Sequence, residues 1–120
     1  MAHANYEECI DACDACAQAC DHCATACLQE PDVASLAECI RLDIDCAALC
    51  RLTSGAMARG SSAVADLCAA CARVCDRCAQ ECERHSKMAH CAACAKACRA
   101  CAEQCRSMSG AAARSPAAIA

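Results

Sequence analysis

The sequence predicts an all-α protein, folded as an antiparallel up-down-up-down four-helix bundle with a Cys-lined core. Its 120 residues contain 19 cysteines, and most of these recur at alternating intervals of three and four residues. Such intervals place side chains on one face of an α-helix, where a bundle normally has Leu or Ile. Four segments with this pattern are joined by short connections, which favour antiparallel neighbours.

The first two helices are predicted over residues 6–29 and 33–53, with a turn containing Pro31 between them. Ser35 and Glu38 form an alternative capping pair, which would start the second helix later. The second helix is poorer in cysteine than the first, and Asp43 occupies the position where the pattern would place another thiol. The cysteines of these two helices are Cys9, Cys13, Cys16, Cys20, Cys23, Cys27, Cys39, Cys46 and Cys50.

The third and fourth helices are predicted over residues 62–84 and 87–107, with Gly110 expected to end the fourth. The connection before the third helix is predicted from Ser54 and Gly55 through Gly60 and Ser61, and His85 and Ser86 form a tight link before the fourth. The cysteines of these two helices are Cys68, Cys71, Cys75, Cys78, Cys82, Cys91, Cys94, Cys98, Cys101 and Cys105. We expect residues 1–108 to form one domain and residues 109–120 a flexible C-terminal tail.

Composition and charge exclude several classes of partner. The net charge is −4 with mixed signs, and neither a basic patch nor a long apolar run is present, so we expect no nucleic-acid and no membrane partner. The first residues lack the basic and apolar regions of an export signal, so we expect a cytoplasmic location. Disulfides are rare there, which leaves the thiols available as metal ligands.

Several possible uses of the thiols are disfavoured by the pattern. A disulfide framework requires Cα separations that cysteines stacked on one helical face seldom meet, and 19 is an odd number. Iron–sulfur clusters are usually held by loop motifs that are absent from this sequence. A redox enzyme would use one or two exposed, activated thiols, so we expect no enzyme. A metal-free interaction bundle would not explain why thiols replace Leu.

Cu(I) explains the column of thiols best, and zinc is the alternative. Zinc prefers four ligands in a tetrahedron, usually at one or two sites per domain. Cu(I) is soft, prefers thiolate and accepts two or three ligands, so thiolates shared between ions would hold on the order of 19 ions per chain. Pairs of cysteines three or four residues apart on one helix face the same way and could each bridge one ion.

Three further side chains are candidate ligands. Asp43 is expected either to escape to water, or to accept hydrogen bonds from nearby thiols or cap a copper ion that lacks a thiolate. If Asp43 is buried beside thiols, we expect its own pKa to be raised. His85 continues the stripe three residues after Cys82, and it is either a copper ligand or a solvated residue at a helix end. With His90 and Met88 nearby, this end of the bundle is the predicted entrance for metal.

With these residues in place, the chain resembles the bacterial copper storage protein family in its cytosolic branch. The resemblance covers about residues 9–108, and the repeated C-x2-C and C-x3-C stripe carries it. It implies a homotetramer of four-helix bundles, each filled with many Cu(I) ions that are bound mostly by cysteine pairs. It also implies histidine near one open end, and storage or buffering of copper as the function.

Overall fold

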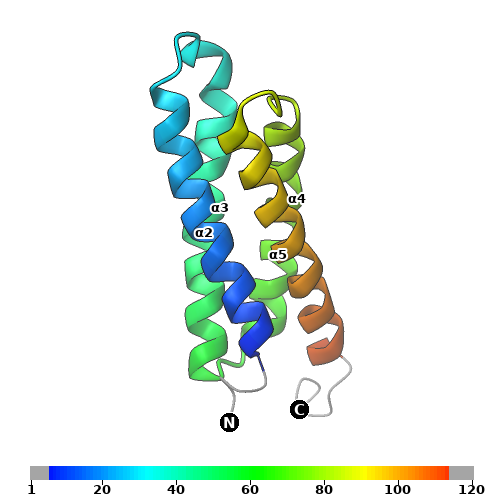
Figure 1. Cartoon of the computed structure of the whole chain (residues 1–120). Helices are drawn as coiled ribbons and strands as arrows, with labels where there is room; N and C mark the ends of the chain where they lie inside the picture. Colours follow the sequence, from blue (N-terminus) through cyan, green and yellow to red (C-terminus); the bar gives the residue numbers. More distant parts are fainter. Residues whose placement is uncertain (1–5, 114–120) are drawn as a thin grey trace.

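The computed structural model describes residues 6–113, which form a four-helix bundle (Figure 1). The bundle consists of α2 (Glu7–Leu28), a short 3-10 helix η1 (Val33–Leu36), α3 (Ala37–Arg59), α4 (Val64–Glu83) and α5 (Ala89–Ala113). Helices α2 and α4 each pack chiefly against α3 and α5. Sequential helices run in opposite directions, so α2 begins and α5 ends at the same end of the bundle (Figure 1). The predicted all-α, antiparallel architecture is therefore confirmed.

Thiols and small side chains fill the core. All nineteen cysteines are buried, with at most 1% of any of them exposed. Alanines beside the stripe are also buried, including Ala17, Ala47, Ala72 and Ala102. Because these side chains are small, facing backbones approach closely, and this brings thiols from different helices together.

Helix α3 is longer than the sequence predicted. The expected connection began at Ser54, but the helix continues through Gly55 to Arg59. The added turn buries Ala56 and Met57 against the core, and this burial outweighs the low helix propensity of Gly55. The helix ends at Gly60, which has a φ of 65° and donates its N–H to the Met57 carbonyl.

Three other boundaries differ from the prediction. Residues 33–36 form η1 instead of the first turn of an α-helix, and Leu36 anchors this segment in the core. The link between α4 and α5 runs over residues 84–88, longer than the predicted tight turn. Helix α5 ends at Ala113 and not near Gly110, because one glycine lowers helix stability without obliging a helix to stop. Residues 114–120, most of the predicted tail, lie outside the described part of the chain.

The outer faces of the helices are polar. Arg51 of α3 pairs with Asp21 of α2, and Arg99 of α5 pairs with Asp76 and Glu83 of α4. Exposed pairs of this kind each contribute at most about 1 kcal/mol, so the core dominates the stability of the bundle. No described helix has an apolar stretch long enough to cross a membrane.

We expect Gly60→Ala to destabilise the protein by about 1–2 kcal/mol, because an L-residue with a side chain is strained in the left-handed conformation. Gly55→Ala is the matched control. Its Cβ would meet only the flexible end of Arg59, at 2.9 Å, and alanine favours a helix interior by about 1 kcal/mol. Urea unfolding of the reduced protein should therefore give opposite signs for the two variants, and equal signs would contradict the assigned end of α3.

Candidate metal centre

The cysteines form a column of free thiols along the axis of the bundle. The shortest sulfur–sulfur distances, 3.6 Å, all join different helices. They are those of Cys16–Cys98, Cys39–Cys82, Cys46–Cys75 and Cys13–Cys101. Pairs four residues apart on one helix are somewhat longer, from 3.8 Å for Cys71–Cys75 to 4.0 Å for Cys16–Cys20. Contacts between helices therefore supplement the expected pairs within one helix.

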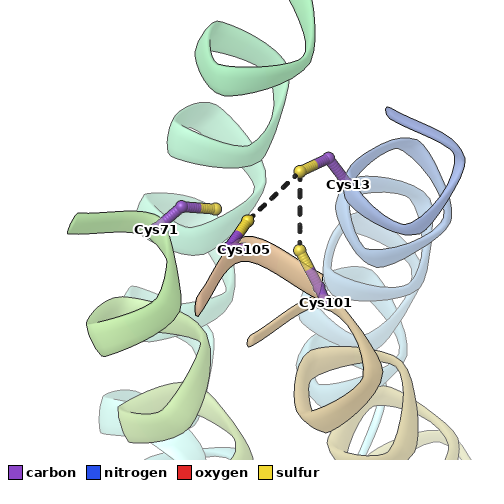
Figure 2. Close-up of side chains that lie close together, drawn as sticks. All are labelled: Cys13, Cys71, Cys101 and Cys105. Atoms are coloured by element: carbon purple, nitrogen blue, oxygen red, sulfur yellow. Dashed lines mark hydrogen bonds between the residues drawn. The ribbon is translucent and has the colours of Figure 1, made fainter. Parts of the chain in front are cut away.

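One group of four thiols lies toward the end of the bundle where α2 begins. Cys13 of α2 lies 3.6 Å from Cys101 and 3.7 Å from Cys105, both on α5. Cys71 of α4 completes the group, whose four sulfurs all lie within 4.8 Å of one another. Figure 2 shows these side chains converging from three helices. The arrangement brings together thiols that lie up to 92 residues apart in the sequence.

Neighbouring groups of four thiols overlap along the column. Cys16 and Cys46 belong to two of these groups, and Cys20 and Cys98 also belong to two. The overlapping groups are Cys16/Cys46/Cys50/Cys75, Cys16/Cys20/Cys46/Cys98 and Cys20/Cys78/Cys94/Cys98. Successive groups therefore share ligands, which suits a metal that binds bridging thiolates.

Asp43 lies inside the column and is fully buried. Its Oδ1 accepts hydrogen bonds from the thiols of Cys78 at 3.2 Å and Cys94 at 3.3 Å, and its Oδ2 accepts one from Cys39 at 3.9 Å. Desolvation by burial is the main cause that raises the pKa of Asp43 to about 10. The predicted thiol contacts and raised pKa are confirmed, and the alternative of escape to water is excluded.

Three thiols and one imidazole converge at the opposite end of the bundle, and we call Cys23, Cys27, Cys91 and His90 the mouth cluster. The three sulfurs lie 3.8–3.9 Å apart, and His90 Nδ1 lies 3.5–3.8 Å from each of them. In a tetrahedron with such edges, the centre lies about 2.3 Å from each vertex, which is the length of a zinc–sulfur bond. The mouth cluster is thus close to the geometry needed to hold one ion.

The two predicted histidines have different surroundings. His90 joins the mouth cluster, and its other ring nitrogen, Nε2, lies 3.0 Å from Glu30 Oε2. His85 Nε2 lies 2.9 Å from Glu81 Oε2, one helical turn earlier in the chain. Of these two histidines, only His90 contacts thiol sulfurs, although His85 is the one in register with the stripe.

Burial opposes ionisation of the thiols at the mouth. It raises the pKa of Cys27 to about 11, and it also raises the pKa of Cys91. A free thiol has a pKa of about 8.5, so these two stay protonated near neutral pH until a cation displaces the proton.

Some features of the site were not visible in the sequence. Glu30 was predicted only as part of a turn, and nothing in its neighbourhood marks it as a partner of His90 across 60 residues. At the end of the bundle opposite the mouth cluster, Met57 was expected in a loop but is fully buried in the last turns of α3. Met108 is half-buried against the same core.

Comparison with known proteins gives consistent matches. A family model described as copper storage protein matches residues 2–110. The Cu(I)-bound copper storage protein BsCsp3 is 48% identical, with 91% of this chain and 99% of that chain covered and a TM-score of 0.83. Apo copper storage protein 3 from Bacillus subtilis is 50% identical, with 86% and 97% covered and a TM-score of 0.81.

A cytosolic copper storage protein from Streptomyces lividans, loaded with five coppers, is 42% identical to this chain. The comparison covers 91% of this chain and 95% of that one, with a TM-score of 0.86. No curated protein matches the chain.

Proposed function

This chain belongs to the copper storage protein family, and from that premise we propose that it stores and buffers many Cu(I) ions on its core thiols. The observation that carries this function is the series of sulfur contacts of 3.6–4.0 Å that leads from Cys9 to Cys94. Cu(I) accepts two or three soft ligands and shares thiolates between ions. With shared ligands, the column holds on the order of one ion per thiol, or about 19 per chain.

Charge balance explains how so many cations fit in a dry core. An isolated ion buried in a medium of low dielectric constant is strongly disfavoured. Each Cu(I) that binds displaces one thiol proton, so the local charge does not change. The column therefore fills without the repulsion that stacked uncompensated charges would produce.

We propose roles for the candidate ligands other than cysteine. His90 supplies an imidazole nitrogen to the mouth cluster, since imidazole also suits copper. Asp43 lies where a thiol is missing from the stripe and serves there as a hydrogen-bond acceptor or as an oxygen ligand. His85 lies at the same end as His90, and this end is the entrance for Cu(I).

Zinc is less favoured by the arrangement of the thiols. A structural zinc site is closed by four ligands of its own. The overlapping groups of the column share members such as Cys16 and Cys46, so two adjacent groups cannot both form separate four-ligand sites. The relatives with bound metal also carry copper.

We further propose a cytoplasmic location and storage instead of catalysis. The Streptomyces lividans relative is described as cytosolic, and the family is one of storage proteins. All nineteen thiols are buried, whereas redox enzymes expose the thiol that reacts. A homotetramer is the assembly that we expect.

An anaerobic titration of the reduced protein with Cu(I), against a chromophoric Cu(I) chelator, tests the function. We expect saturation near one Cu(I) per thiol, with little Zn(II) bound in a parallel titration. Saturation at roughly four or five ions with zinc preferred, as four thiolates per ion would give, would overturn the copper assignment. Gel filtration of the same samples tests the tetramer separately.

A further inference from the structure

We propose that Glu30 is a positioning residue for the entrance of copper, because its carboxylate holds the His90 ring with Nδ1 directed at the three thiols of the mouth cluster. This inference rests on the proposed function, and it assigns a role to a residue outside the set of predicted metal ligands.

The geometry places the two ring nitrogens of His90 against different partners. Nε2 lies 3.0 Å from Glu30 Oε2, while Nδ1 lies 3.5 Å from the sulfur of Cys91 and 3.7 and 3.8 Å from those of Cys23 and Cys27. The His90 side chain is 13% exposed and that of Glu30 is 33% exposed. The pair therefore lies at the boundary between solvent and the thiol column.

The backbone fixes the position of Glu30 relative to the cluster. Its N–H donates to the carbonyl oxygen of Cys27 at 3.1 Å, in the turn that ends α2, and Pro31 follows. Proline restricts both its own φ and the conformation of the preceding residue. The carboxylate is thus anchored three residues after one thiol of the cluster, and it reaches across to the first turn of α5.

The chemistry of the pair assigns the proton on the ring. An ionised carboxylate only accepts hydrogen bonds, so Nε2 must carry the N–H that it donates to Glu30. In the neutral ring, Nδ1 then presents its lone pair to the thiols. A metal-binding imidazole usually donates the N–H of its other ring nitrogen to a carboxylate, which orients the ring. Loss of such a carboxylate typically costs 10- to 100-fold in metal affinity or activity.

The test is the rate of copper transfer from a Cu(I)–bicinchoninate complex to reduced, metal-free protein. We expect Glu30→Ala to slow the first phase by roughly tenfold, with final capacity unchanged because every thiol remains. Glu30→Gln, which still offers an acceptor oxygen, should restore most of the rate. Glu81→Ala is the matched control, because Glu81 pairs with His85 in the same way, and it should leave the His90 ring unaffected.

A double-mutant cycle separates positioning from simple attraction of a cation by the negative charge. In a His90→Ala background, we expect Glu30→Ala to have no further effect on the rate. Imidazole 15N NMR of the metal-free protein should show Nε2 protonated and Nδ1 unprotonated in the wild type, and rotational averaging of the ring in Glu30→Ala.

Three results would overturn the inference. The first is an unchanged rate of copper transfer in Glu30→Ala. The second is that Glu30→Ala slows the transfer equally in the wild type and in the His90→Ala background. The third is that Glu30→Gln transfers copper as slowly as Glu30→Ala. If the wild type itself does not fill with Cu(I), the storage function fails instead. The final capacity of the wild type, measured in the same experiment, distinguishes these cases.

Discussion

Replacing four thiols of α2 with alanine is expected to lower the Cu(I) capacity by at least about a fifth while the bundle stays folded. The four are Cys13, Cys16, Cys20 and Cys23. The sulfur of each contacts a sulfur of α5, and Cys16 also contacts Cys46 and Cys75. Because thiolates shared between ions are lost with these residues, the capacity should fall in at least rough proportion to the number of thiols removed.

The measurement is the anaerobic Cu(I) titration, with far-UV circular dichroism to follow the helices. The control replaces four exposed residues of the same helix with alanine: Asp11, Asp14, Gln18 and Thr25. These side chains point away from the column, so the control should bind as much copper as the wild type. If the cysteine variant keeps its helices and its full Cu(I) capacity, the proposal that the ions are held by thiolates shared along the column is wrong.

Asp43→Asn is expected to remove a pH dependence from the stability of the metal-free protein. Asp43 has its pKa raised to about 10 in the folded state, mainly by desolvation. In the unfolded chain, an aspartate ionises near pH 3.9. Between these values the folded protein binds the additional proton, so the stability falls as pH rises, by up to about 1.4 kcal/mol per pH unit. The carboxamide of the variant does not ionise in this range, so its contribution to the free energy of unfolding does not depend on pH.

Urea unfolding of reduced protein at about pH 4.5, 6 and 7.5 measures this effect below the range in which free thiols ionise. The variant and wild type should have similar stability at the lowest pH, and the variant should become the more stable of the two as pH rises. Asp45→Asn is the control on the same helix, because Asp45 is exposed. Parallel curves for Asp43→Asn and the wild type would show that the buried carboxyl ionises as it does in the unfolded chain.

The fold could be predicted because one chemical pattern repeats on every helix. Intervals of three and four residues place Cys9 through Cys27 on a single face, and the same holds for Cys68 through Cys82. The helix boundaries were harder to predict, because local propensity competes with burial. Gly55 suggested a turn, yet burying Met57 extends α3 beyond it.

The candidate site could be predicted in its composition but not in its pairings. Periodicity identifies which thiols face inward, and it also placed Asp43 among them. It does not say which sulfur lies against which, because that depends on the relative height of facing helices. The 3.6 Å contact between Cys16 and Cys98 joins residues 82 positions apart.

The sequence by itself thus determined the fold class, the thiol column and the softness of the metal it favours, since these follow from helical period and ligand type. Only the tertiary structure decided which histidine meets the thiols. His85 was in register, but it pairs with Glu81, while His90 turns into the mouth cluster opposite Glu30. The physical reason is that the packing of helix ends and turns, which no single-helix pattern encodes, sets the direction of a side chain at the mouth of the bundle.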